Sequence, residues 1–148
     1  MPQFSDPMIE VEVTPNRPDC LSVHGIARDI AAYGVGSLKK VSVNSVKSEA
    51  QNPIEVKIAV KEKCRLFVHR YFSDVQNVES SQDIKALLEA IGEVPISASV
   101  DITNYMNYSF GRPMHVYDAD KIKGGLVVAE LDKPSKLLGL DGKEYSLE

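Results

Sequence analysis

Short stretches of alternating or helically spaced apolar residues cover most of the chain, and polar runs separate them. Residues 8–13 alternate between apolar and acidic side chains, which predicts a half-exposed strand. The next run, 14–19, holds two prolines and predicts a rigid turn. Asp19 is placed to cap the helix that the apolar spacing predicts over 21–31, and Gly34 is placed to end it.

Two further segments have helical spacing. Ser80 or Ser81 is placed to cap the first segment, and Ser80 with Asp83 resembles a capping box in which Asp replaces Glu. Gly92 is placed to end this helix. The second predicted helix covers 100–110. Because its Val, Ile, Thr and Tyr residues also favour sheets, a strand remains the alternative there.

The alternating stretches predict strands over 54–60, 65–75 and 126–131, and a hairpin over 137–147 around the Asp141-Gly142 turn. Strands and helices mix without a regular βα repeat. The predicted fold class is therefore α+β, with a mixed sheet and a few short helices. A polar run suggests a linker over 41–53. It would separate an N-terminal strand–turn–helix segment (1–40) from a main body (54–148).

Composition places the chain among globular proteins, since 43% of its 148 residues are hydrophobic and 26% are charged. The apolar runs are too short to span a bilayer, and no secretion signal is visible. Cys20 and Cys64 are therefore expected to be reduced thiols in the cytoplasm. The net charge of −4 argues against strong binding of a polyanion by this chain alone.

Several common kinds of site lack their residue pattern. His24, His69 and His115 are far apart, and no Cys or His pair has zinc spacing, so no metal site is expected. Cys20 has no identifiable base and is interpreted as a small apolar residue. No phosphate loop or dinucleotide fingerprint is present. Arg17 is either a contact to a partner or part of a rigid corner, and the corner is favoured because nearly every neighbouring residue has a backbone role.

Chemistry is expected where a polar run meets a sharp turn. Thr103 and Asn104 are poor helix formers that compete for backbone hydrogen bonds. Gly111, followed by Pro113, redirects the chain, so that His115 is placed to point back toward Asn104. From composition alone, a binding site and an ordinary helix with a glycine stop are about equally favoured.

Several motifs in one order carry a family resemblance. The run Thr14-Pro15-Asn16-Arg17-Pro18-Asp19-Cys20-Leu21-Ser22 is followed by Val100-Asp101-Ile102-Thr103-Asn104-Tyr105, Gly111-Arg112-Pro113-Met114-His115, Tyr117-Asp118 and Leu140-Asp141-Gly142-Lys143. The order and spacing resemble the beta subunit of bacterial phenylalanyl-tRNA synthetase from about Ile9 onward. The resemblance implies a central fragment of that subunit, including part of its editing domain.

The resemblance implies a heterotetramer of two alpha and two beta subunits. Such an enzyme charges tRNA(Phe) with phenylalanine in the cytoplasm, using ATP and magnesium in the holoenzyme, and no cofactor is expected in this fragment. The editing domain hydrolyses tyrosine wrongly attached to tRNA(Phe). A second sieve is useful because an apolar pocket rejects an added hydroxyl only weakly. The fragment alone is expected to be inactive, and no membrane partner is expected.

By position, the resemblance implies that the editing pocket is lined by Thr103, Asn104, Pro113, Met114 and His115. Asn104 would orient substrate and water, and His115 would orient the water or act as a weak base, so these two are the catalytic candidates. Pro113 and Met114 would shape the wall. The family often has an arginine where this chain has Val94, so a basic contact would be absent.

Two other interpretations compete with the editing site. A non-catalytic module that scaffolds the synthetase would keep the same motifs without hydrolysing anything. A free-standing deacylase or binding protein on the same fold is a third possibility, and the Pro-Asn-Arg-Pro run, which joins flanking modules in the family, argues against it.

Overall fold

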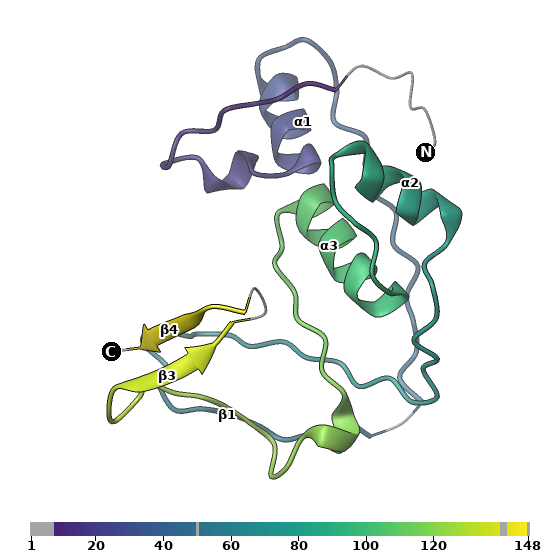
Figure 1. Ribbon diagram of the computed structural model, residues 1–148. Helices are drawn as coiled ribbons and strands as arrows, with labels where there is room; N and C mark the ends of the chain where they lie inside the picture. The colour runs from purple at the N-terminus through teal and green to yellow at the C-terminus, as the bar shows by residue number, and fades with distance from the viewer. Residues whose placement is uncertain (1–7, 50, 140–141, 148) are drawn as a thin grey trace. The chain divides into compact units, whose positions relative to one another are not determined.

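The computed structural model describes residues 8–49, 51–139 and 142–147 (Figure 1). Its elements are η1 (Pro18–Cys20), α1 (Val23–Ala32), β1 (Val56–Ile58), α2 (Gln82–Ala90), α3 (Ala98–Phe110), η2 (Ala119–Lys121), β2 (Leu126–Val128), β3 (Ser135–Leu138) and β4 (Glu144–Leu147). The α+β class is confirmed. Parallel pairing (β1 with β2) and antiparallel pairing (β3 with β4) both occur, in two separate two-stranded sheets.

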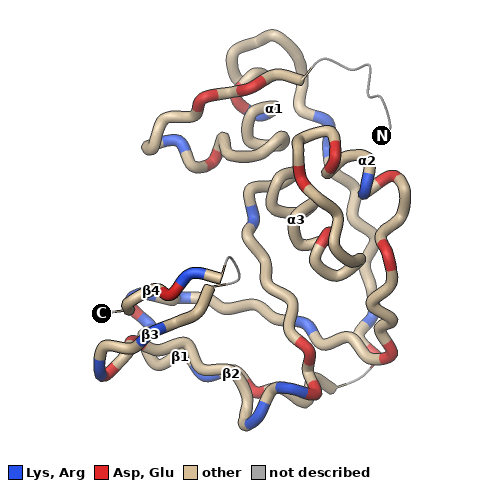
Figure 2. Tube along the Cα trace, in the orientation of Figure 1, with Lys and Arg blue, Asp and Glu red and all other residues tan. Residues whose placement is uncertain are grey.

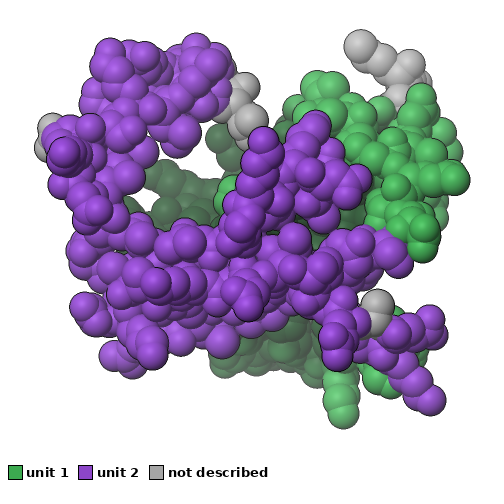
Figure 3. Space-filling view, turned by 90° about the horizontal axis from the view of Figure 1, so that it is seen from below, with its two compact units in different colours: residues 1–46, 74–116 green, residues 47–73, 117–148 purple. Residues whose placement is uncertain are grey.

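The chain groups into two compact units, which Figure 3 colours separately. Unit 1 combines residues 1–46 with 74–116 and holds all three α-helices, whereas unit 2 combines 47–73 with 117–148 and holds the strands. The N-terminal segment therefore groups with a stretch from the middle of the chain. The predicted boundaries of 1–40, 41–53 and 54–148 stay a prediction about domains. Acidic and basic residues intersperse along the trace of both units (Figure 2).

The three predicted helices are confirmed, with the same glycines at their ends. Gly34, Gly92 and Gly111 all have positive φ, as predicted for residues that follow a helix C-terminus. The strand alternative for 100–110 is wrong, because α3 covers this segment.

The helix caps are confirmed only in part: Ser81, one of the two candidates, is the N-cap residue of α2, whereas Asp19 and the capping box of Ser80 with Asp83 are wrong. Asp19 lies within η1, and the cap of α1 is Ser22, whose hydroxyl accepts from the Gly25 N–H at 3.0 Å. Ser80 forms no capping box with Asp83, because its hydroxyl is bonded to Asp101 instead. The Ser80 hydroxyl is taken by a residue 21 positions away in the sequence, whereas the Asp19 carboxylate accepts from the nearby Arg17 and Arg28.

The strand predictions are confirmed only in part. The cores of the segments 54–60 and 126–131 pair as β1 and β2, in the register Val56 to Leu126. The segments 8–13 and 65–75 form no strand in the part of the chain that the structure describes, so these two predictions are wrong. Alternation fixes which side chains share a face, but a strand also needs a neighbour that takes its backbone hydrogen bonds.

In unit 2, a glycine allows the parallel pair to form. Gly125 has φ +95°, and a Cβ at this position would lie 2.7 Å from the Glu55 carbonyl oxygen. The next residue, Leu126, donates its N–H to the same carbonyl at 2.8 Å. The hairpin of β3 and β4 is also confirmed, with Gly142 at φ +76°, although Asp141 lies outside the described residues.

Asp101 holds unit 1 together at the N-termini of α2 and α3. Its carboxylate is 1% exposed and accepts from the Ser80 hydroxyl at 2.6 Å and from the Ile96 N–H at 2.8 Å. Burial raises the pKa of this carboxyl, but the hydrogen bonds from Ile96, Ser80 and Ser97 outweigh burial and hold the pKa below its ordinary value. The folded chain therefore stabilises the charged form of Asp101.

Within the described residues, no helix has the length and apolarity needed to cross a membrane.

We expect Asp101→Asn to lower the free energy of unfolding of the chain by about 2 kcal/mol, because an amide replaces an acceptor that faces buried donors. Urea denaturation at neutral pH measures this loss. The matched control is Asp83→Asn, an exposed aspartate in the first turn of α2, with an expected loss below about 1 kcal/mol.

The loss from Asp101→Asn should also depend on pH. Because folding lowers the pKa of Asp101, its stabilisation is complete above its unfolded pKa of about 4 and disappears as the pH falls through the folded value. The difference between the wild type and Asp101→Asn should therefore shrink in acid. Equal losses for the Asp101 and Asp83 variants at neutral pH would refute the role given to Asp101.

Candidate functional site

Helix α3 carries two of the predicted site residues near its middle. Thr103 is half-buried, and its hydroxyl donates to the Val100 carbonyl at 2.6 Å, as threonines in helices often do. This bond uses the only proton of the hydroxyl. Thr103 is therefore left to accept a hydrogen bond from a ligand or water, and not to donate one.

Asn104 differs from Thr103 in that its side chain is uncommitted. It is half-buried on α3, and no hydrogen bond of its amide is found within the described part of the chain. An amide offers two protons and an acceptor oxygen. Asn104 is thus chemically suited to orient a polar ligand or a water, as is the half-buried Asn107 of the same helix.

The remaining predicted site residues follow a sharp turn at the end of α3. Gly111 adopts the left-handed conformation (φ 66°, ψ 30°), and its N–H donates to the Asn107 carbonyl at 2.7 Å. Figure 1 shows the chain reversing direction here. Pro113, Met114 and His115 lie on the exposed segment that follows, still within unit 1.

The structure thus places the predicted residues in two groups of one unit, the α3 pair and the segment after Gly111. Their convergence on one pocket stays a prediction. A shallow hollow elsewhere in unit 1 is lined by Asp29, Ile30, Ala32, Tyr33 and Val35, none of which was predicted to be part of a site. No group of three His, Cys, Asp or Glu side chains suited to a metal ion occurs among the residues described.

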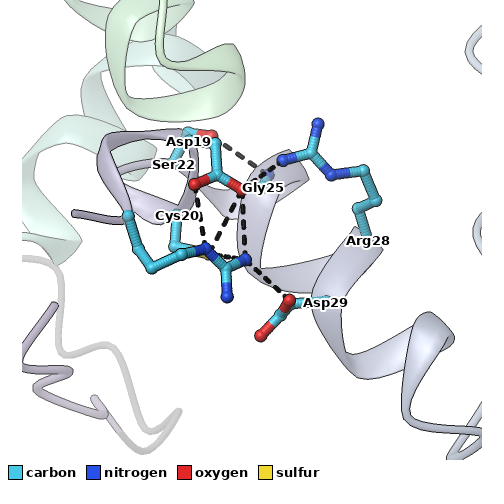
Figure 4. A network of polar contacts seen from close by, with 7 residues as sticks. Asp19, Cys20, Ser22, Gly25, Arg28 and Asp29 are labelled. Atoms are coloured by element: carbon cyan, nitrogen blue, oxygen red, sulfur yellow. Dashed lines mark hydrogen bonds and ion pairs between the residues drawn. The ribbon is translucent and has the colours of Figure 1, made fainter. Parts of the chain in front are cut away.

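The N-terminal corner, residues 14–22, is held by a network of charges (Figure 4). The Arg17 guanidinium donates to both oxygens of Asp19 at 3.1 Å and to Asp29 at 2.7 Å, and Arg28 donates to Asp19 at 2.6 Å. With two carboxylates on its guanidinium, Arg17 serves the rigid corner that the sequence favoured. The Arg17 hydrogen bonds lower the pKa of Asp19 to about 2.

The interpretation of Cys20 as a small core residue also agrees with the structure. Its side chain is buried and forms no disulfide, and the Arg17 guanidinium lies 3.0 Å from its sulfur. Burial, the largest effect, raises the pKa of this thiol. A thiol with a raised pKa is a poor nucleophile at neutral pH, so Cys20 belongs to the packing of the corner.

Two residues that sequence analysis missed, Ser22 of this corner and His24 in the first turn of α1, contact the end of α3. The Ser22 hydroxyl lies 3.3 Å from the place where Gly111 would carry a Cβ. The His24 ring contacts the Phe110 ring, with 5.8 Å between centroids and 42° between planes. No local pattern announces these contacts, because the partners are far apart in the sequence. The only signal in the sequence that relates these partners is the order of the two family motifs, residues 14–22 and 111–115.

Comparison with known proteins gives a consistent answer. A family model described as the B3/4 domain matches residues 63–148. Phenylalanine–tRNA ligase beta subunits are similar to nearly the whole chain: that of Mesorhizobium japonicum is 47% identical over 144 residues (97% of this chain, 18% of the relative), and that of Ruegeria pomeroyi 48% over 149 residues (99% and 19%). That of Rickettsia bellii is 51% identical over 125 residues (84% and 14%).

The chain therefore spans less than a fifth of the length of these relatives. The match extends over the N-terminal corner, α3 and the segment after Gly111 alike, because it covers 97% of the chain or more in two of the three relatives. The predicted resemblance to this kind of beta subunit is confirmed.

We expect Arg17→Gln to raise the pKa of Asp19 from about 2 toward its ordinary value near 3.8. The reason is that Gln removes the charge and the hydrogen bonds that are the largest cause of the shift. Carbon-detected NMR titration of the Asp19 carboxyl measures the change, and Lys39→Gln, a distant exposed lysine, serves as the control.

The sign of the pH effect follows from the lowered pKa. The stabilisation by Asp19 is complete above its unfolded pKa and is lost only as the pH falls through about 2. An Asp19 pKa that stays near 2 in Arg17→Gln would show that Arg17 is not its cause.

We expect Gly111→Ala to destabilise the chain more than Gly92→Ala does. Both positions have positive φ, which costs an L-residue about 1–2 kcal/mol, but only at Gly111 would the new methyl group meet Ser22. Thermal or urea unfolding of the two variants measures the difference. Equal losses would mean that Ser22 does not restrict the turn.

Proposed function

Because the chain belongs to the B3/4 domain family, we propose that it serves a phenylalanine–tRNA ligase beta subunit as part of an editing site that hydrolyses tyrosine wrongly attached to tRNA(Phe). The observation that carries this proposal is the 47% identity with such a beta subunit over 97% of the chain. The aligned region includes every motif on which the resemblance was first based.

A second site is needed because tyrosine and phenylalanine are too similar in shape for one pocket to separate them well. Tyrosine is phenylalanine with one added hydroxyl, and an apolar pocket discriminates weakly against an added group. Hydrolysis at a second site raises the overall selectivity. The bond to be cleaved is an activated ester, so the site needs an oriented substrate and a placed water more than a strong nucleophile.

The groups available suit that task. Asn104 offers an uncommitted, half-buried amide that orients the substrate or the water. Thr103 accepts a hydrogen bond, because its own proton is held by Val100. His115, four residues after the turn at Gly111, takes a proton from the attacking water, and Pro113 and Met114 line the wall.

The wider proposal follows from the relatives' name. The chain would act within an assembly of alpha and beta subunits, taken as two of each, that binds tRNA(Phe) and charges it with phenylalanine in the cytoplasm. That assembly would use ATP and magnesium at a site outside this chain. In this proposal, the amide of Asn104, the hydroxyl of Thr103 and the imidazole of His115 carry the editing step.

A scaffold without catalysis is the second candidate. The observation that favours it is the exposure of the segment from Gly111 to His115. In this role, the corner and α3 would hold neighbouring modules of the subunit together. The scaffold predicts that substitutions on this segment leave editing unchanged.

We expect His115→Ala and Asn104→Ala each to slow the hydrolysis of Tyr-tRNA(Phe) by the complete ligase at least about tenfold, because each removes a group that places or deprotonates the water. The rate of deacylation of pre-charged Tyr-tRNA(Phe) is the measurement. Charging with phenylalanine should stay unchanged in both variants, which shows that the ligase is assembled.

Asn44→Ala is the matched control, since Asn44 is an exposed asparagine of the same unit that is no part of the proposed site. Wild-type editing rates in both site variants would remove Asn104 and His115 from the mechanism and leave the scaffold.

A further inference from the structure

The end of α3 is fixed by the N-terminal corner at the point where the chain turns toward His115. Ser22 is 7% exposed, and its hydroxyl is held in place by the Gly25 N–H. The same hydroxyl oxygen lies 3.3 Å from the position of a Cβ on Gly111, which is close packing for a backbone. The turn therefore rests directly against the first turn of α1.

A second contact lies one residue earlier along α3. The His24 ring, from the first turn of α1, meets the Phe110 ring at the last turn of α3, with centroids 5.8 Å apart. Tilted ring pairs at this separation are favourable in both contact area and electrostatics. Gly111 and the 40% exposed Phe110 thus each contact one residue of the same short segment.

The segment that makes these contacts is itself rigid. Gly25 lets η1 approach α1 closely, since a Cβ there would lie 1.7 Å from the Asp19 carbonyl oxygen. The charges of Arg17, Asp19 and Asp29 close the corner from the other side. Short-range contacts therefore fix η1 and Ser22 relative to α1, the helix that carries His24.

A small change in backbone direction at Gly111 would produce a larger displacement of His115. Four residues of extended chain reach about 13 Å, so a rotation of about 10° at Gly111 would move His115 by about 2 Å. A misplacement of about 1 Å is enough to cost a hundredfold in rate when a group must be aligned. The turn must therefore be held accurately for His115 to act.

From these contacts we infer that Ser22 and His24 are positioning residues for the editing step, which fix the direction in which the chain leaves α3 and so place His115. This inference rests on the proposed function. It gives the N-terminal corner, which makes no predicted contact with substrate, a role in the rate of hydrolysis. The role is exerted through Phe110 and Gly111.

The test uses His24→Ala and His24→Phe in the complete ligase. We expect His24→Ala to lower kcat for Tyr-tRNA(Phe) hydrolysis about tenfold with little change in KM, because the water is misplaced while the tRNA still binds. His24→Phe keeps an aromatic ring against Phe110 and should restore most of kcat. Unchanged charging with phenylalanine shows that each variant is folded and assembled.

A double-mutant cycle separates positioning from a general loss of stability. If His24 acts through His115, then adding His24→Ala to His115→Ala should slow hydrolysis by less than twofold further. A full tenfold additional loss in the double variant would overturn the inference, since His24 would then act independently of His115. A failure of His24→Phe to restore kcat would also overturn it.

Hydrogen exchange of the Gly111 amide gives a readout that does not depend on activity. This amide donates to the Asn107 carbonyl, and we expect its exchange to be at least about fivefold faster in His24→Ala and unchanged in His24→Phe. If His115→Ala slows editing while His24→Ala changes neither kcat nor this exchange, the inference is wrong and the proposed function stands. If His115→Ala has no effect, the inference is wrong, and the proposed function fails with it only if Asn104→Ala also leaves editing unchanged.

Discussion

One buried carboxylate determines the arrangement on which the candidate site depends. Asp101 is almost fully removed from solvent, and it joins the residue before the cap of α2 to the residue before the cap of α3. A charge in such a position is costly unless donors surround it. Here the Ile96 and Ser97 N–H groups before α3 and the Ser80 hydroxyl before α2 supply those donors, so the cost of burial becomes a constraint on where α3 begins. Thr103 and Asn104 follow within one turn and take their places from it.

Polar groups are three of the five buried side chains described in unit 1. Of the described side chains, Cys20 and Leu88 are the buried apolar ones, while Ser22, Ser80 and Asp101 are buried and polar. Each of these three polar groups has a partner in the structure. Hydrogen bonds depend on direction more strictly than apolar contacts do. The bond between Ser80 and Asp101 therefore restricts how α3 lies beside α2.

Glycine at the end of α3 gives the same unit a change of direction that few other residues allow. Gly111 has the left-handed conformation that ends the helix, and it has no side chain where Ser22 approaches. These two requirements coincide at a single residue, at the start of the exposed segment that carries Pro113, Met114 and His115. The N-terminal corner and the turn that leads to the candidate site are therefore in direct contact, although residues 23–110 separate them in the sequence.

The sequence by itself determined the three helices, the glycines that end them, the hairpin and the likeness to a ligase beta subunit. These features depend on neighbouring residues or on the order of motifs, and both are visible in one dimension. Only the tertiary structure decided that Ser80 bonds to Asp101, that Ser22 meets Gly111 and that residues 8–13 and 65–75 remain unpaired. The physical reason is that a hydroxyl, a backbone surface or a strand edge takes whichever partner the fold brings near, and local spacing does not encode that partner.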